Sequence, residues 1–417
     1  MIGIEPWVLW VATAACLYMA WTIGANDVAN AMGTSVGSHA ITLNQAVLLA
    51  ALFEFGGAFL VGGHVTDTVR KGIVAPAVFQ GHPELFVLGM LSALLAAGIW
   101  LHLATYLGLP VSTTHSMIGS ITGFGLLVGG PAAVQWGKLG SVVMSWIVSP
   151  VAGGIVGWLT FTYIKRTVLA TWNPVSAARG IVPILVVPVT VTIVLSVLYK
   201  GLKNLHLDLP PAQALLTSLA AGAAAFVAMR ILLVRKYSHR PRKRADAFAQ
   251  VERLFAYLQV GTACSVAFAH GANDVANAIG PFAAIFAVFR SGDLAMKVPV
   301  PVWMLGLGGL GIVVGLATWG YRVIETVGKR ITAITPSRGF SAEFATAATV
   351  LVCSKMGLPI STSHTLVGSV IGVGLARGIA ALNLRVILSI INSWLITIPA
   401  AAGVTVLLYL ALKAILL

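Results

Sequence analysis

Charged side chains are scarce in this sequence of 417 residues. Only 9% of them are charged, 12 residues are acidic, 58% are hydrophobic and the mean hydropathy is +0.94. Soluble proteins carry about a quarter charged residues, so this chain lies far outside their range. The composition therefore excludes a soluble globular protein and indicates a chain that resides mostly in a lipid bilayer.

Metal-ligand cysteine spacings and nucleotide-binding loops are also missing. The three cysteines, Cys16, Cys264 and Cys353, all lie in apolar segments and are far apart in the sequence. They do not form a disulfide framework or a zinc site, and we interpret them as small packing residues. The phosphate-binding pattern G-x-x-x-x-G-K-[ST] does not occur, so the sequence gives no sign of nucleotide hydrolysis.

Basic residues are in excess, which raises the question of a nucleic-acid partner. The net charge is +14, and the densest basic run, RKYSHRPRKR at 235–244, directly follows an apolar segment. The positive-inside rule places such a run in a cytoplasmic loop, with attraction to anionic lipid as a minor addition. We therefore expect an orienting loop and no nucleic-acid partner.

Long apolar runs recur along the whole chain. A helix needs roughly 20 apolar residues to cross the hydrocarbon core of a bilayer. The sequence thus predicts an all-α integral membrane protein with about ten to twelve transmembrane segments, near 7–26, 42–63, 86–107, 111–130, 140–163, 181–199, 212–234, 254–270, 300–324, 343–356, 358–376 and 386–416.

Two motifs occur twice at nearly the same spacing. GANDVANA begins at Gly24 and again at Gly271, an offset of 271 − 24 = 247. GLPVSTTHSMIGSITGFG begins at Gly108 and GLPISTSHTLVGSVIGVG at Gly357, an offset of 357 − 108 = 249. Duplicated membrane halves are typical of secondary transporters, whose binding site lies at the repeat interface near the bilayer midplane.

The repeats divide the chain into three parts. We expect a first transmembrane repeat at 1–165, linking helices with the basic loop at 166–253, and a second repeat at 254–417. Whether the halves are parallel or inverted depends on whether the segment 111–130 spans the membrane or re-enters it. The residues leave this open, and broken or re-entrant helices are expected after the polar motifs.

Acidic residues inside apolar runs are the first candidates for function. Asp27 and Asp274 lie in the duplicated motif, and Glu54 and Glu343 interrupt apolar stretches. A carboxylate in the bilayer is costly unless compensated, so by default it marks an ion pathway. The alternative is an acid at the membrane surface or paired with a distant arginine. Gln259, in the apolar run leading to Asp274, is an additional coupling candidate.

The GANDVANA motifs concentrate side-chain oxygens within one helical turn. Oxygen ligands of this kind suit a hard cation such as sodium, which we place at the two aspartates and the neighbouring asparagines. The alternative is a helix broken at glycine whose amides cap freed backbone groups, and this is compatible with a cavity lining. The predicted cation residues are Asn26, Asp27 and Asn30 in the first repeat and Asn273, Asp274 and Asn277 in the second.

The second motif has hydroxyl side chains where a helix should begin. Pro110 and Pro359 precede these hydroxyls, and proline followed by hydroxyl residues is a helix-start signal. A helix N-terminus binds anions, and hydroxyls add donors for a tetrahedral oxyanion. The alternative is that they only cap the helix. His115 and His364, which could bind metal or shuttle protons, are better interpreted as packing residues. The predicted anion-binding residues are Ser112, Thr113, Thr114, Ser361, Thr362 and Ser363.

Both motif pairs together resemble the signature of the inorganic phosphate transporter (PiT) family, and the resemblance covers both halves nearly end to end. It implies an inverted repeat, a membrane-embedded homodimer and phosphate uptake driven by sodium or protons. It assigns the motif aspartates to cation coupling and the PVSTTH and PISTSH hydroxyls to phosphate. Similar transporters have an important glutamate in each half, matching Glu54 and Glu343. These two lie 343 − 54 = 289 residues apart, so they are not equivalent in the repeat.

The resulting prediction is a symporter of the cytoplasmic membrane that imports inorganic phosphate with sodium by alternating access. It needs no cofactor and is not an enzyme. A proton-coupled phosphate or sulfate permease of the same family is the main alternative. A passive channel and an intramembrane hydrolase, in which two aspartates share a proton, are more remote.

Overall fold

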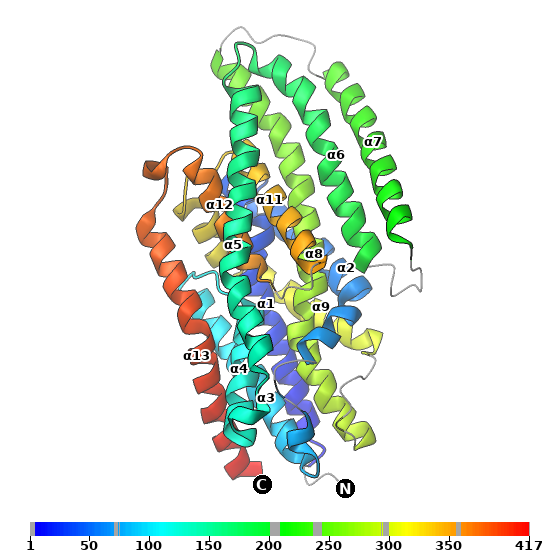
Figure 1. Ribbon diagram of the computed structural model, residues 1–417, viewed down its shortest axis with the longest axis vertical. Helices are drawn as coiled ribbons and strands as arrows, with labels where there is room; N and C mark the ends of the chain where they lie inside the picture. The colour runs from blue at the N-terminus through cyan, green and yellow to red at the C-terminus, as the bar shows by residue number, and fades with distance from the viewer. Residues whose placement is uncertain are drawn as a thin grey trace.

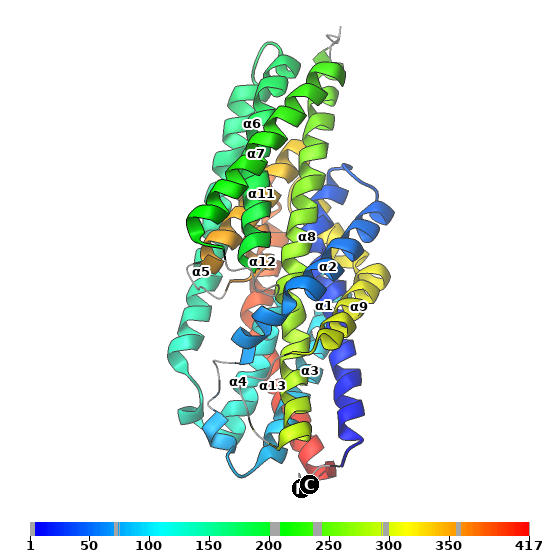
Figure 2. The same ribbon diagram turned by 90° about the vertical axis from the view of Figure 1, so that its right-hand side faces the viewer.

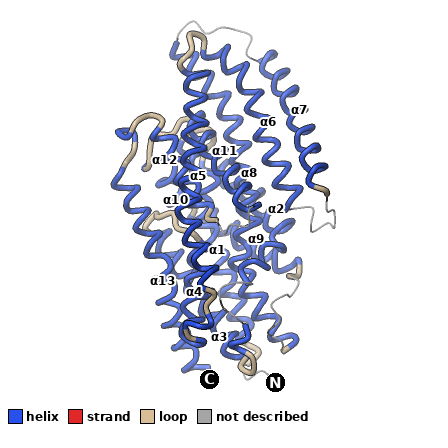
Figure 3. The backbone as a smooth tube through the Cα atoms, in the orientation of Figure 1, coloured by secondary structure: helices blue, strands red, loops and turns tan. Residues whose placement is uncertain are grey.

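The computed structural model describes residues 5–70, 74, 76–200, 209–236, 244–292, 294, 300–355 and 360–416. Figure 3 shows that helices make up nearly all of this part of the chain. The α-helices are α1 (Val8–Gly37), α2 (Leu43–Arg70), α3 (Pro83–Tyr106), α4 (Thr113–Gly129), α5 (Trp136–Ile164), α6 (Pro174–Lys200), α7 (Pro211–Lys236), α8 (Arg244–Ser291), α9 (Val302–Trp319), α10 (Tyr321–Glu325), α11 (Pro336–Lys355), α12 (Thr362–Leu375) and α13 (Leu384–Leu416).

Nine helices in the described residues are long and apolar enough to cross a membrane, which confirms an all-α membrane protein. Three of the twelve predicted segments fall outside this set and correspond to α4, α11 and α12. α4 has 17 residues and α12 has 14, fewer than the roughly 20 that span a bilayer. They are half-helices, as the sequence indicated for the segments after the polar motifs.

Two hairpins of helices enter the molecule from opposite ends. In Figure 1, α3 and α4 occupy the end that carries both termini, and α11 and α12 occupy the upper half. α3 packs against α4, and α11 against α12. The first residues of α4 and α12, which carry the duplicated hydroxyls, therefore both lie in the middle of the molecule.

The two helices that carry GANDVANA, α1 and α8, pack side by side and run in opposite directions (Figures 1 and 2). Both motifs lie inside continuous helices, so the alternative of a helix broken at glycine does not occur. The glycines instead permit close contact between helices. A Cβ on Gly24 would lie 1.9 Å from the carbonyl oxygen of Ile312 in α9, and one on Gly271 would lie 2.0 Å from that of Glu54 in α2.

The linking helices α6 and α7 pack against each other along one side of the bundle (Figure 1). α8 begins at Arg244, ahead of residue 254, where we placed the start of the second repeat. Most of the basic run 235–244 lies outside the described residues. Its flanks, the end of α7 and the start of α8, lie at the end of the molecule opposite both termini.

Candidate functional site

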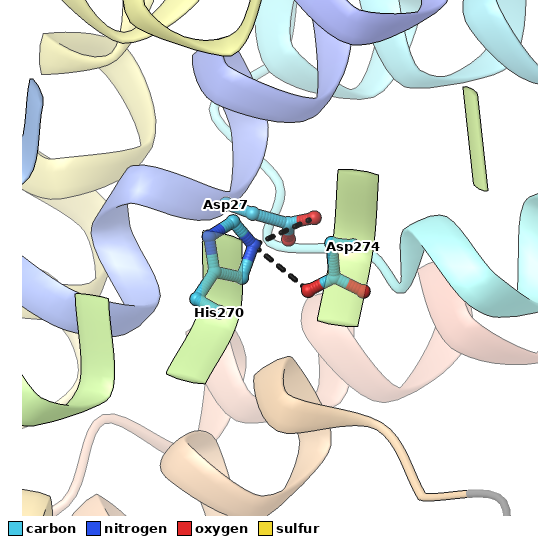
Figure 4. Close-up of side chains that lie close together, drawn as sticks. All are labelled: Asp27, His270 and Asp274. Atoms are coloured by element: carbon cyan, nitrogen blue, oxygen red, sulfur yellow. Dashed lines mark ion pairs between the residues drawn. The ribbon is translucent and has the colours of Figure 1, made fainter. Parts of the chain in front are cut away.

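Three ionisable side chains from α1 and α8 meet in the middle of the bundle (Figure 4). Nε2 of His270 lies 2.9 Å from Oδ2 of Asp274 and 3.6 Å from Oδ2 of Asp27. All three residues are buried, and one ligand atom from each lies within 4.8 Å of the others, a spacing that can hold a metal ion. The cluster brings together the predicted aspartates of the two repeats.

Hydroxyls from both half-helices reach the Asp27 carboxylate. Oγ1 of Thr113, the first residue of α4, donates to Oδ2 of Asp27. Oγ of Ser363, near the start of α12, lies 3.1 Å from Oδ1 of the same carboxylate. The positive ends of two helix dipoles therefore point to one buried region, which favours negative charge there.

The asparagines of the two motifs form hydrogen bonds between the repeats. Nδ2 of Asn30 donates to Oγ of Ser363 at 2.7 Å, and Nδ2 of Asn277 donates to Oγ1 of Thr114 at 3.3 Å. Asn30 and Asn277 correspond in the repeat, as do Thr114 and Ser363, so each asparagine contacts the half-helix of the other repeat. Each asparagine also donates to the aspartate of its own motif, at 2.9 and 3.1 Å.

The side-chain oxygens of these two asparagines are the strongest sign of a ligand. Oδ1 of Asn30 and Oδ1 of Asn277 are buried and accept no hydrogen bond within the described part of the chain. Buried polar atoms almost always have a partner, so a matched pair of free oxygens needs an explanation. Each lies on the same side chain that holds an aspartate, an arrangement that suits a hard cation.

Asn26 has different contacts from its motif neighbours. Its Nδ2 donates to Oγ1 of Thr105 at 3.0 Å and to the carbonyl oxygen of Leu109 at 3.1 Å, and its Oδ1 accepts from the backbone N–H of Val111 at 3.2 Å. The amide therefore holds the connection that leads into α4. Asn273 lies half-buried beside Asp274.

The six predicted hydroxyl residues make different contacts. Oγ of Ser112 and Oγ of Ser361 cap α4 and α12 by accepting from the backbone N–H three residues later, at 3.3 and 3.2 Å. Thr113, Thr114 and Ser363 face the aspartates and asparagines, as described above. Thr362 lines a cavity of about 20 Å³ between helices, together with residues such as Ser265. Capping and side-chain donation thus occur on different members of each motif.

His270 was not predicted from the sequence, yet it connects the acidic residues. Its Nδ1 lies 3.4 Å from Oε2 of Glu54, which is fully buried on α2. The equivalent position in the first repeat, 270 − 247 = 23, is Ile23. Comparison of the repeats therefore could not identify this histidine. The available signal was a single imidazole inside an apolar run, directly before the motif glycine.

Glu343 lies in a separate buried cluster and does not join the aspartates. Its carboxylate accepts from the hydroxyls of Thr34, Ser35 and Thr262, the last two at 2.8 and 2.6 Å, and from Nε2 of Gln259 at 3.4 Å. Thr34 is seven residues after Asp27 in the same helix, or about 10 Å along its axis. The α1 hydroxyls that follow GANDVANA were missed by the sequence reasoning.

The two motif histidines form an aromatic cluster behind the half-helices. The ring centroids of His115 and His364 are 4.8 Å apart, and His364 stacks on Trp394 with centroids 3.8 Å apart. Trp146 packs against His115 at 4.6 Å. These contacts agree with the interpretation of both histidines as packing residues.

The protein is an all-helical membrane bundle in which two half-helices from opposite ends meet at a buried polar site. This arrangement is typical of membrane transporters. The model of the phosphate transporter family matches residues 23–405. The chain therefore belongs to the phosphate transporter family and is a multi-pass membrane protein.

Individual relatives agree with this assignment. The chain is 44% identical to the "Putative phosphate permease" of Haemophilus influenzae, over 98% of this chain and 97% of the relative. It is 45% identical to "Inorganic phosphate transporter 2-1, chloroplastic" of Arabidopsis thaliana, over 94% of this chain and 70% of that protein. A solved structure titled "The sodium-dependent phosphate transporter" is similar with a TM-score of 0.88 and 42% identity, covering 98% of this chain and 100% of that one.

Proposed function

We propose that this protein is a symporter of the cell membrane that imports inorganic phosphate together with sodium by alternating access. The observation that carries the proposal is the charge of the central site. Asp27, Asp274 and Glu54 are buried around His270, the one basic side chain of the cluster within the described residues. Buried carboxylates that lack compensation are strongly destabilising, so the site requires added positive charge before an anion can enter.

The cation sites follow from the paired aspartates and asparagines. Asp27 with Asn30 and Asp274 with Asn277 each combine a carboxylate with a free amide oxygen. Sodium, a hard cation, is suited to such oxygen ligands. Glu343, with Gln259 and three α1 and α8 hydroxyls around it, is a further coupling candidate at a separate depth.

The phosphate site follows from the two half-helix starts. Hydroxyls of Thr113, Thr114 and Ser363 lie beside the cation ligands, and the backbone N–H groups of the first turns of α4 and α12 supply positive dipole ends. With sodium bound next to the aspartates, a tetrahedral anion at the helix starts would lie beside bound positive charge. Phosphate and sodium therefore stabilise each other in the site, which couples their transport.

Alternating access would come from the two repeats moving around this site. The opposite directions of α1 and α8 support an inverted repeat, and the exchange of asparagine contacts links the two repeats at the site. We include a homodimer in the proposal, on the basis of family membership. A proton-coupled version of the same transport is the second candidate, because His270 places a titratable group between the acids.

Uptake of radiolabelled phosphate into proteoliposomes tests the proposal. An inward sodium gradient and an inward proton gradient are imposed separately, and sulfate is added as competitor. We expect uptake to follow the sodium gradient and to resist sulfate.

The outcomes separate the candidates. Uptake that follows only the proton gradient would replace sodium by protons, and displacement by sulfate would change the anion. Uptake that needs no gradient and does not saturate would identify a channel and contradict symport. Protein-free vesicles of the same lipid are the blank.

A further inference from the structure

A groove that is not lined by the aspartates, asparagines or hydroxyls of the central site lies on the outer surface of the bundle. It has a volume of about 560 Å³ and is lined by apolar side chains of α5, α12 and α13. The lining includes Val151, Ile155, Trp158, Ile371, Leu375 and Ile391. Its volume is within the range of about 300–1,000 Å³ that is usual for small-molecule sites.

Glycines line this groove where α5 and α12 cross. A Cβ on Gly368 would lie 2.2 Å from the carbonyl oxygen of Pro150, and one on Gly372 would lie 2.0 Å from that of Gly154. The backbones of α5 and α12 therefore touch, and no side chain can fill the space beside the contact. Gly154, Gly368 and Gly372 all line the groove.

Positive charge lies at one end of the groove. Leu375 lines it, and the carbonyl oxygen of the next residue, Ala376, accepts from Nζ of Lys165 at 3.2 Å. Arg377 follows, with Nη1 3.1 Å from the carbonyl oxygen of Ala333. Lys165 and Arg377 are both exposed, and neither forms an ion pair with the described acidic residues.

A third cation is held at the same place. Nη1 of Arg338 donates to the carbonyl oxygen of Ala333 at 3.0 Å, the same oxygen that Arg377 contacts. Nε of Arg338 is buried and has no hydrogen-bond partner among the described residues. Three positive side chains thus share two carbonyl oxygens. The Glu252 carboxylate, which accepts from the backbone N–H of Ser337 at 2.8 Å, lies near Arg338, so Lys165 and Arg377 are the two cations here without a nearby acid among the described residues.

We propose that this groove binds an anionic phospholipid, with an acyl chain along the glycine floor and the headgroup phosphate at Lys165 and Arg377. The commitment to a lipid rests on the combination of an open apolar groove on a membrane-spanning helix and a cation pair at its end. Trp158, partly exposed, lies seven residues before Lys165 on α5, about 10 Å along the helix.

The position of the cations agrees with the distribution of anionic lipid. α5 ends at Ile164, directly before Lys165, toward the end of the bundle where α7 ends and α8 begins, on either side of the basic run 235–244. The positive-inside rule assigns this end to the cytoplasm, and the cytoplasmic leaflet carries the anionic lipids.

Native mass spectrometry of the full-length protein tests the site without reference to transport. Phosphatidylglycerol and phosphatidylcholine with identical acyl chains are titrated onto the delipidated protein. We expect a single high-affinity phosphatidylglycerol per protomer. A variant with Lys165→Gln and Arg377→Gln should bind it roughly 30-fold more weakly, as two basic residues near a membrane surface would predict.

Two matched controls separate charge from shape. Lys413→Gln with Arg290→Gln removes the same charges from exposed residues toward the opposite end of the molecule and should leave binding unchanged. Ile155→Trp fills the groove, whereas Leu159→Trp alters an equally exposed residue of α5 outside its lining, since the two side chains are 55% and 53% exposed. Only the first should displace the lipid.

Four results would overturn the proposal. They are equal retention of the two lipids, unchanged binding in the Lys165 and Arg377 variant, displacement of the lipid by inorganic phosphate, or a dimer whose formation is lost in Ile155→Trp while lipid binding is not. The last would assign the groove to a second copy of the chain.

Discussion

At the scale of single residues, the central site depends on pairs of groups rather than on isolated ones. Asp27 and Asp274 are each held by an asparagine of their own motif, and His270 lies between them. Because the carboxylates are buried, each depends on nearby donors or a bound cation. Changes to single side chains here should alter cation binding far more than folding.

Neutralising either aspartate tests the cation role. Asp27→Asn and Asp274→Asn keep the side-chain shape and remove a charge that would attract sodium by about 4 kcal/mol at about 4 Å. We expect sodium-dependent phosphate uptake to fall roughly a thousand-fold in each variant, with an unchanged thermal unfolding midpoint. Glu84→Gln, which removes an acid next to His82 outside the site, is the matched control. Wild-type uptake in either aspartate variant would refute the assignment.

The asparagines should separate into binding and positioning residues. Asn30→Ala and Asn277→Ala remove the free amide oxygens, so the sodium concentration at half-maximal uptake should rise about tenfold, one lost ligand contact of about 1.4 kcal/mol. Asn26→Ala instead releases the connection before α4 and should lower the unfolding midpoint with little change in sodium dependence. Titration of uptake against sodium, together with thermal unfolding, measures both. A reversed pattern would mean that Asn26 is the ligand.

At the scale of helices, close backbone contacts position the site. α1 approaches α9 at Gly24, and α8 approaches α2 at Gly271. The second contact places Glu54 of α2 beside His270 of α8, because the glycine follows the histidine directly. The half-helices α4 and α12 then present their hydroxyls to this fixed frame through serine caps at Ser112 and Ser361.

Adding one methyl group to α8 should therefore have opposite effects at two glycines. Gly271→Ala places a Cβ 2.0 Å from a backbone carbonyl oxygen and should destabilise the protein by about 1–3 kcal/mol, the usual cost of overpacking. Gly261→Ala, in the same helix, meets no atom within 4 Å and should be neutral or stabilise by up to about 1 kcal/mol. Thermal unfolding in detergent compares them. Equal midpoints would contradict the close contact of α8 with α2.

At the scale of the whole molecule, the distribution of charge should fix the orientation in the membrane. The basic run 235–244 is flanked by helix ends that lie opposite both termini. By the positive-inside rule, we expect that end in the cytoplasm and the termini outside. The short loop between α5 and α6 would then be cytoplasmic, and the one between α4 and α5 external.

Labelling with a membrane-impermeant maleimide in intact cells checks the orientation. Ala132→Cys, exposed between α4 and α5, should react in intact cells. Trp172→Cys, at a fully exposed position between α5 and α6, should react only after permeabilisation. Background is low because Cys16 and Cys353 are buried and Cys264 is partly buried. The opposite pattern would reverse the predicted orientation.

Much of the architecture could be predicted from the residues alone, because the signals are local. Apolar runs located the membrane helices, and the nearly equal offsets of 247 and 249 residues within the two motif pairs revealed the duplication. Proline followed by hydroxyls predicted two helix starts, and α4 and α12 begin at those hydroxyls. The alternative reading of GANDVANA, a helix broken at glycine, does not occur, because glycine there serves contact between helices and not a bend.

What the sequence determined by itself was which residues are unusual: acids, asparagines and hydroxyls in apolar surroundings, repeated at one spacing. Only the tertiary structure decided which of them meet. It joined Asp27 to Asp274 through His270 and moved Glu343 into another cluster, with Thr34 and Ser35. The physical reason is that Asp27 lies 270 − 27 = 243 positions from His270, and Ser35 lies 308 positions from Glu343, so these contacts depend on how helices cross. Only the contact between His270 and Asp274 is local, at four residues in one helix. His270 has no counterpart in the first repeat. Comparing the repeats therefore cannot show that it lies where α1 and α8 meet.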